Sequence, residues 1–228
     1  MSVLIMQLVS PMQSWGSRSR FQERDTEREP TKSGVIGLIC AALGRDRKDS
    51  IDDLVLLHMG VRVDREGTIK KDFQTAQDVI KADGSKPPDS NQISSRAYLE
   101  DAAFLVGLEG DRFLLKTIAD HLKNPVWPIS LGRKAFVPSL PILPKKDPEE
   151  CLFDDSLASV LANYPLVIPY SKRLDENRDA LRLVLECKPG ESGERRQDVP
   201  VSFDFDKRSF QSRYVSVSWI PVPGGKEE

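Results

Sequence analysis

Two short apolar runs constrain the fold of this chain most strongly. They cover residues 3–9 (VLIMQLV) and residues 102–108 (AAFLVGL), and each is bounded by polar or turn-forming residues. Runs of this length and composition are typical of strands that are buried on both faces. We therefore predict that both runs form buried strands.

A helix is predicted from Lys32 to Leu43. Pro30 precedes it, Thr31 or Ser33 can cap its N-terminus, and Gly44 is suited to its C-terminus. Two glycines within one turn, at positions 34 and 37, lower its helix propensity. They predict close packing there against a neighbouring strand or the backbone of a ligand.

The patterns between the two buried strands indicate further strands and an excursion. Residues 58–65 alternate as a strand does, and residues 68–76 and 94–99 can pair around a polar tip at residues 81–92 that is rich in proline and glycine. An amphipathic helix follows at residues 112–123. The order is β-α-β-β-α-β with one long hairpin insert, so the fold class is α+β and the pattern is that of a ferredoxin-like sheet.

Four prolines break the chain between residues 138 and 148, and we place a domain boundary there. Residues 1–147 form the ferredoxin-like domain, with the hairpin inserted at about 68–99. Residues 148–228 form a smaller, β-rich C-terminal domain. Its predicted elements are a helix at about 155–163 and strands near 181–187, 199–205 and 213–220.

Composition limits the possible functions. The chain has 33 Lys and Arg against 35 Asp and Glu, a net charge of −2, so a nucleic-acid site must concentrate its positive charge locally. Three widely separated cysteines indicate neither a disulfide framework nor a zinc site. The first apolar run is too short for a signal peptide and no run can span a bilayer. We expect a cytoplasmic protein with no membrane partner, no metal and no cofactor.

A first basic island lies between Pro11 and the predicted helix. Its cations lie close in sequence to the free N–H groups of the helix N-terminus, and two aromatic residues, Trp15 and Phe21, offer stacking faces. The cations are Arg18, Arg20, Arg24, Arg28 and Lys32. Acids at positions 23, 25, 27 and 29 interleave with them, so a solvated loop of ion pairs is an equal alternative.

A second basic island, residues 131–136 (LGRKAF), contains Arg133, Lys134 and a glycine that permits close backbone approach. Two such islands on one sheet favour RNA binding. A third patch, at residues 207–214, is weaker because Asp204 and Asp206 dilute its charge.

Catalytic patterns are sparse. There are two histidines, His58 in a predicted strand and His121 near a helix end, and no hydrolase or metal motif surrounds either. Structural or surface histidines are therefore the favoured reading. Residues 31–34 (TKSG) lack the preceding glycine of a phosphate-binding loop.

Four ordered segments carry a family resemblance: PMQSWG, SRFQERDTEREPTKSGVIGLICAALGR, SSRAYLEDAAFLVGLEG and WPISLGRKAFVPSLPI. Together they resemble the CasD subunit family of type I-E CRISPR Cascade, in the RAMP superfamily. The resemblance implies a ferredoxin-like (RRM-related) domain with a protruding β-hairpin thumb and a smaller C-terminal domain. It implies a non-catalytic subunit in antiviral defence that binds the 5′ handle of the CRISPR RNA and contacts the adjoining backbone subunit. The large subunit belongs to the same complex, and target DNA is reached indirectly through it.

The resemblance also implies roles for individual positions. Gln13, Ser14, Trp15, Arg18, Arg20 and Arg24 lie along the handle, and Lys32 and Ser33 take a phosphate. Arg96 and Tyr98 at the hairpin base complete the groove with Arg133 and Lys134. The tip at residues 81–92 reaches between the handle and the next subunit.

Two alternatives stay open. Related subunits in another subtype cut RNA, so the chain is alternatively a metal-independent endoribonuclease that processes CRISPR repeat RNA, using His58, His121 or Tyr98 with Lys134. A generic interaction protein, whose basic islands bind acidic protein, is the third hypothesis.

Overall fold

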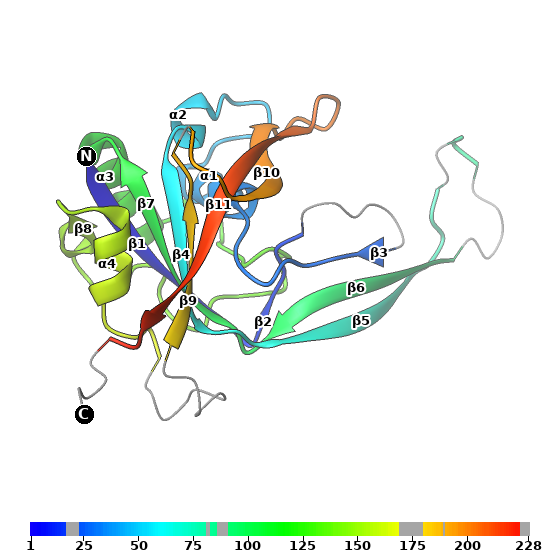
Figure 1. Cartoon of the computed structure of the whole chain (residues 1–228). Coiled ribbons are helices and arrows are strands. Elements are labelled where there is room, and N and C mark those ends of the chain that lie inside the picture. The colour runs from blue at the N-terminus through cyan, green and yellow to red at the C-terminus, as the bar shows by residue number, and fades with distance from the viewer. Residues whose placement is uncertain (17–22, 81–82, 86–90, 169–179, 189, 224–228) are drawn as a thin grey trace.

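The computed structural model describes residues 1–16, 23–80, 83–85, 91–168, 180–188 and 190–223. It is a mixed α/β structure whose strands pair almost entirely antiparallel (Figure 1). A seven-stranded sheet has the order β10-β11-β9-β4-β7-β1-β8, and a second sheet carries a long hairpin.

The centre of the large sheet is formed by the two apolar runs. They become β1 (Ser2–Val9) and β7 (Ala103–Gly110), which pair antiparallel along their whole length. Their side chains are almost completely buried, as predicted. On either side lie β4 (His58–Arg65) and the short β8 (Leu152–Phe153).

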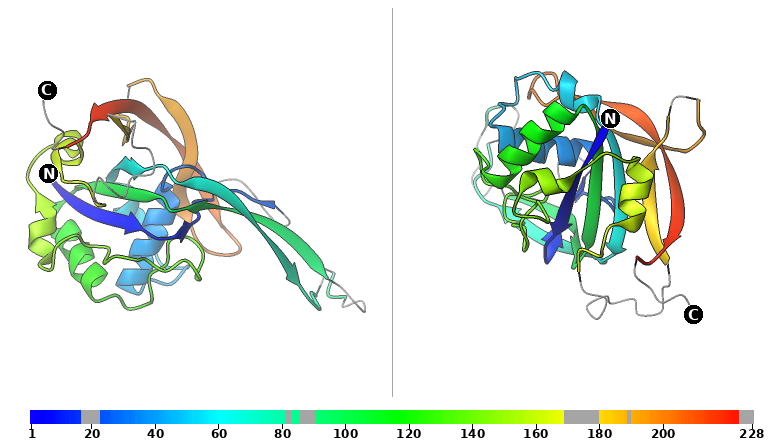
Figure 2. Two further views of the ribbon diagram at one scale, coloured as in Figure 1. Left: turned by 90° about the horizontal axis from the view of Figure 1, so that it is seen from below. Right: turned by 90° about the vertical axis from the view of Figure 1, so that its left-hand side faces the viewer.

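Helices α1 (Lys32–Leu43) and α3 (Arg112–Lys123) lie side by side on one face of this sheet (Figure 2). The bounds of both match the prediction. The hydroxyl of Thr31 accepts a hydrogen bond from the Gly34 N–H at 3.2 Å, and Gly44 ends α1 with a φ of 73°. Helix α4 (Leu157–Asn163) packs against β4 and β7 at two glycines, Gly60 and Gly107. A short helix, α2 (Asp52–Val55), precedes β4.

A hairpin of β5 (Thr68–Ala76) and β6 (Gln92–Glu100) projects from the body (Figure 1). Two short strands pair with β6: β2 (Met12–Gln13) antiparallel near the hairpin base, and β3 (Glu23–Arg24) parallel further out. Of the predicted tip, residues 81–82 and 86–90 lie outside the described residues. Residues 12–13 and 23–24 therefore lie beside a hairpin that comes much later in the chain.

The C-terminal segment continues the large sheet. After the 3₁₀ helix η1 (Pro148–Cys151), strand β9 (Ala180–Glu186) pairs with β4, and β11 (Ser209–Pro221) pairs with both β9 and β10 (Glu194–Ser202). The predicted helix and strands are present with bounds shifted by a few residues, most of all at β10. The sheet thus crosses the boundary expected near residue 147, and the division into two domains stays a prediction.

Candidate nucleic-acid interface

Three arginines meet at the base of the hairpin. Arg24 of β3 and Arg96 of β6 lie directly opposite one another in the pairing of the two strands. Arg133 joins them from the irregular segment after α3, because its Nη2 donates a hydrogen bond to the carbonyl of Ala97 at 2.6 Å. None of the ion pairs among the described residues involves any of these three side chains. We call Arg24, Arg96 and Arg133 the hairpin-base cluster.

The pKa of Arg133 is lowered by its burial and in part because like charges lie close to it. Burial lowers the pKa of its guanidinium, and the charges of Arg96 and Arg24 lower it further, while Asp72 opposes them. Its Nη1 is buried and has no hydrogen-bond partner among the described residues. A buried cationic donor without an acceptor is costly, so an anion in this position would supply what the protein does not.

Two aromatic rings border the cluster. The rings of Tyr98 and Phe136 have centroids 6.1 Å apart and are tilted by 53°. The guanidinium of Arg133 lies 5.3 Å from the centroid of the Phe136 ring. Phe136 is buried and Tyr98 is half-buried. Sequence reasoning did not assign Phe136 to the site, although its place in the second basic island was a usable signal.

The two basic islands are joined by backbone contacts. The N–H of Ser14 donates to the carbonyl of Leu131 at 3.1 Å, and the N–H of Phe136 donates to the carbonyl of Arg133 at 2.8 Å. Gly132 has a φ of 98°, and a Cβ there would lie 1.9 Å from the Ser14 carbonyl oxygen. Only glycine permits this approach, and it is this approach that holds Arg133 beside Arg24 and Arg96.

Trp15 does not present a free stacking face, so that expectation is corrected. It is 1% exposed, and its indole packs on α1, where a Cβ at Gly34 would be 2.7 Å from the ring. The predicted close packing at Gly34 is thus made by an indole and not by a strand or ligand. The indole N–H donates to Gln13 Oε1 at 3.2 Å, and Gln13 Nε2 donates to the carbonyls of Leu8 and Ala102. Both side chains support the loop from inside the protein.

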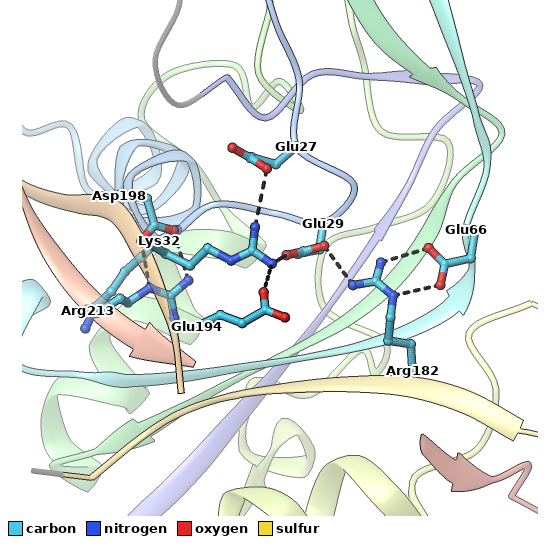
Figure 3. Close-up of polar contacts among 9 residues, drawn as sticks. Glu27, Glu29, Lys32, Glu66, Arg182, Glu194, Asp198 and Arg213 are labelled. Atoms are coloured by element: carbon cyan, nitrogen blue, oxygen red, sulfur yellow. Dashed lines mark hydrogen bonds and ion pairs between the residues drawn. The ribbon is translucent and has the colours of Figure 1, made fainter. Parts of the chain in front are cut away.

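Lys32 is also buried, and this corrects the expectation that it takes a phosphate. Its Nζ donates to both carboxylate oxygens of Glu186, at 2.9 and 3.0 Å. Its backbone N–H donates to Asp198 at 2.8 Å, so a carboxylate already occupies the anion site at the N-terminus of α1 (Figure 3). Arg213 donates to both oxygens of Asp198, at 2.8 and 2.9 Å. Arg213, one of the three cations of the third patch, is therefore paired inside the protein.

Burial and ion pairing together set the pKa shifts of Lys32 and Asp198 in this network. Burial lowers the pKa of Lys32 despite the attraction of Glu186. Burial opposes the ionisation of Asp198, but hydrogen bonds from Arg213 and its charge hold the pKa of Asp198 below its ordinary value. Lys32 is thus paired with Glu186, and Asp198 with Arg213, inside the protein.

Two of the acids that interleave with the first basic island, Glu27 and Glu29, pair with arginines of the C-terminal strands. Arg182 of β9 binds Glu29 at 2.8 Å, and Arg196 of β10 lies 3.2 Å from Glu29 and 3.5 Å from Glu27 (Figure 3). We call the contacts of Arg182, Arg196 and Arg213 with their acids, together with Lys32, the ion-pair network. It leaves the hairpin-base cluster without a counter-charge from Glu27 or Glu29.

The remaining candidates are distributed as follows. Arg28 and Lys134 are exposed, and Ser33 is half-buried with its hydroxyl 3.4 Å from that of Thr31. Arg18, Arg20 and Phe21 lie outside the described residues.

Neither histidine forms a hydrogen bond or ion pair with the hairpin-base cluster in the described part of the chain. His58 begins β4, at the end opposite to the one from which the hairpin leaves, and His121 on α3 contacts the carbonyl of Thr117 at 2.8 Å. Within the part of the chain that the structure describes, no group of three His, Cys, Asp or Glu side chains is placed to hold a metal ion. Nor is any described helix long and apolar enough to cross a membrane.

Comparison with known proteins gives a consistent picture. The sequence model of the CRISPR-associated protein family Cas5 matches residues 3–216. The CRISPR system Cascade subunit CasD of Escherichia coli (strain K12) is 34% identical over 125 residues, which cover 47% of this chain. The match spans about half of that relative, 53% of its length.

Two solved structures are similar over nearly the whole chain. A structure described as a crystal structure of a Cas protein is 40% identical, with a TM-score of 0.74 and 98% of each chain covered. A chain from a CRISPR RNA-guided surveillance complex is 33% identical, with a TM-score of 0.82, and the match covers 97% of this chain and 91% of that one. The chain therefore belongs to the Cas5 family of CRISPR-associated proteins.

Proposed function

We propose that this chain is a non-catalytic subunit of a type I-E Cascade complex, where it binds the 5′ handle of the CRISPR RNA and contacts the adjoining backbone subunit. The observation that carries the proposal is the hairpin-base cluster, in which three arginines converge without an ion-pair partner among the described residues. The relatives support it, since one is named a Cascade subunit and another comes from an RNA-guided surveillance complex.

The chemistry of the cluster suits an RNA backbone. Arginine guanidinium groups bind phosphate oxygens in a fixed geometry, and the orphaned Nη1 of Arg133 is a donor ready for one of them. Tyr98 adds an aromatic surface at the same place, on which an unstacked base can lie. Lys134 and Arg28 are exposed and add positive charge. Arg18 and Arg20 remain proposed contacts. Gln13, Trp15 and Lys32 are buried and bonded within the protein, so we do not propose them as RNA contacts. Ser33 remains a proposed contact.

Binding RNA through phosphate contacts and base stacking needs no general base. Cleavage of RNA without metal requires one near the attacking 2′-hydroxyl. His58 lies at the opposite end of β4, and Tyr98, which borders the cluster, packs its ring against Phe136. The proposed role is therefore to hold the RNA and not to cut it.

The fold accommodates such a role. The strand order β4-β7-β1-β8, with α1 and α3 on one face, supports our proposal of a ferredoxin-like, RRM-related core. We assign the β5–β6 hairpin as the thumb, which reaches between the handle and the next subunit, and the C-terminal strands as a smaller β-rich domain. The partners are CRISPR RNA and the backbone and large subunits, and target DNA is met through the complex.

The test is assembly. The chain, the other Cascade subunits and a CRISPR array are co-expressed, and the tagged chain is purified at moderate salt. Arg24→Ala together with Arg96→Ala should remove most of the co-purifying RNA and subunits. Arg112→Ala, an exposed arginine paired with Glu149 and Asp154, is the control. Unchanged co-purification by the double variant would contradict the proposal.

A second experiment tests the alternative that the chain is a metal-independent endoribonuclease. Purified chain is incubated with repeat RNA in EDTA. Site-specific cleavage that disappears in His58→Ala or His121→Ala would replace the binding role with an enzymatic one.

A further inference from the structure

Residues 25–31 connect the RNA-facing strand β3 to helix α1, and this segment is fastened on two sides. On one side it contacts the buried tryptophan: the N–H of Trp15 donates to the Thr26 hydroxyl at 2.9 Å, and the N–H of Glu27 donates to the Trp15 carbonyl at 2.9 Å. On the other side it contacts the C-terminal strands through its acids. The segment is therefore held between the first strand–helix unit and the last three strands of the sheet.

Glu29 is the centre of the second attachment. It is 8% exposed, and its two carboxylate oxygens meet Arg182 Nη1 at 2.8 Å and Arg196 Nη2 at 3.2 Å (Figure 3). Arg182 is itself fixed by a two-pronged contact with Glu66, at 2.8 Å for each hydrogen bond. Arg196 is fixed by Glu194 at 3.1 Å. Glu66 and Glu194 thus fix the orientations of the two arginines, and the Glu29 carboxylate lies between their guanidinium groups.

The hairpin-base cluster needs such an attachment. Arg24, Arg96 and Arg133 repel one another, and the lowered pKa of Arg133 is partly a consequence of that repulsion. Strand β3 has two residues, Glu23 and Arg24, so its pairing with β6 opposes this repulsion only weakly. The position of Arg24 must then be held largely by the segment that follows it. Holding a binding group in place before the ligand arrives strengthens binding, because less ordering remains to be done.

We infer that Arg182 and Arg196 are positioning residues for the RNA site: acting through Glu29, they hold Arg24 against Arg96 without touching RNA. The inference rests on the proposed function, since it names what prepares that same site. It gives the C-terminal strands a role in RNA binding through the ion-pair network.

The experiment compares two neighbouring arginines of β10 in the full chain. Arg196→Gln removes a contact to Glu29. Arg195→Gln removes the same charge from the next position, where the exposed side chain binds the Ser212 hydroxyl at 2.9 Å. Affinity for a fluorescein-labelled CRISPR repeat RNA is measured over a series of salt concentrations, and amide hydrogen exchange is measured on the free protein.

Arg196→Gln should weaken binding by about fivefold, the scale of a partly exposed ion-pair network. The slope of log affinity against log salt should not change, because no phosphate contact is lost. Exchange should become faster in residues 23–31, including the Glu27 amide that binds Trp15. Arg195→Gln should leave all three measurements as they are in the unchanged protein.

Three results would overturn the inference. They are unchanged affinity in Arg196→Gln, a salt slope reduced by about 0.7, as for one lost phosphate contact, and faster exchange throughout the protein. Arg24→Ala separates this failure from that of the proposed function. If Arg24→Ala weakens binding and Arg196→Gln does not, only the inference fails; if neither weakens binding, the proposed function fails as well.

Discussion

The hairpin-base cluster and the ion-pair network contain the same residue types in opposite states. In the cluster, three arginines share one site, and no described ion pair includes them. In the network, each of Lys32, Arg182, Arg196 and Arg213 meets at least one carboxylate. Cations that are already neutralised inside the protein stabilise the fold, whereas cations held together without acids are available to a polyanion.

The difference comes from the strands that supply the acids. Asp198 and Glu186 lie on β10 and β9 and reach the start of α1 across more than 150 residues of sequence. Among the described residues of the hairpin, Asp72 is the acid whose charge acts on Arg133, and it lies opposite Arg96. Long-range strand pairing, and not local charge, therefore decides which arginine is free.

The largest effect should come from breaking the network at Asp198. Asp198→Asn removes the closer of the two printed carboxylate partners of buried Arg213 and leaves Glu186 at 3.5 Å, which should lower the free energy of unfolding at pH 7 by about 3 kcal/mol. Denaturant titration measures it, with Asp206→Asn in an exposed turn as the control. A loss below about 1 kcal/mol would show that Asp198 is not needed to balance Arg213.

The loss of unfolding free energy in Asp198→Asn should also depend on pH. The pKa of Asp198 is held below its ordinary value of 3.8 in the folded protein. A depressed carboxyl pKa stabilises the fold above the unfolded-state pKa, and this stabilisation is lost as the pH falls through the folded-state pKa. The difference in unfolding free energy between the unchanged protein and Asp198→Asn should therefore narrow from pH 5 toward pH 2. A constant difference over that range would contradict the assignment.

Removal of the cluster should have the next largest effect, on binding and not on folding. Arg24→Ala, Arg96→Ala and Arg133→Ala together should weaken RNA binding by about 100-fold, or about 2.7 kcal/mol. The salt slope should fall by about 2, because three phosphate contacts on single-stranded RNA each contribute about 0.7. Stability should not fall in proportion, since the three charges repel one another. An unchanged slope would mean that these arginines do not meet phosphate.

Local signals explain what could be predicted from the sequence. Helix α1 begins and ends where its capping residues place it, and β1 and β7 are buried as their composition indicates. The glycine at position 34 predicted a close neighbour correctly but did not identify it as Trp15, because the indole reaches it by folding back from the preceding loop. The fate of Lys32 was not predictable, because its partners lie on β9 and β10 and belong to no local pattern.

A substitution at the contact between the two basic islands should have a smaller effect on stability and RNA affinity. Gly132→Ala adds a Cβ that would lie 1.9 Å from the Ser14 carbonyl oxygen, at a φ of 98°. The backbone must move, at a cost of about 1–3 kcal/mol in unfolding free energy, and RNA affinity should fall as Arg133 moves from the cluster. Gly84→Ala is the matched control, because its φ of 80° is also left-handed but nothing lies within 4 Å. Equal losses in the two variants would show that the contact with Ser14 is not essential.

The smallest effect separates charge from shape within the cluster. Arg133→Lys keeps the positive charge but loses three features of the guanidinium: the hydrogen bond to Ala97, the stacking over Phe136 and the free Nη1. Affinity for repeat RNA should fall by about fivefold, close to 1 kcal/mol, while the salt slope stays the same, because the number of charges is unchanged. Lys134→Arg, the reverse exchange at the exposed neighbouring position, should change neither quantity. If Arg133→Lys binds as tightly as the unchanged protein, the cluster acts only as a concentration of charge, and the fixed geometry of Arg133 contributes nothing to recognition.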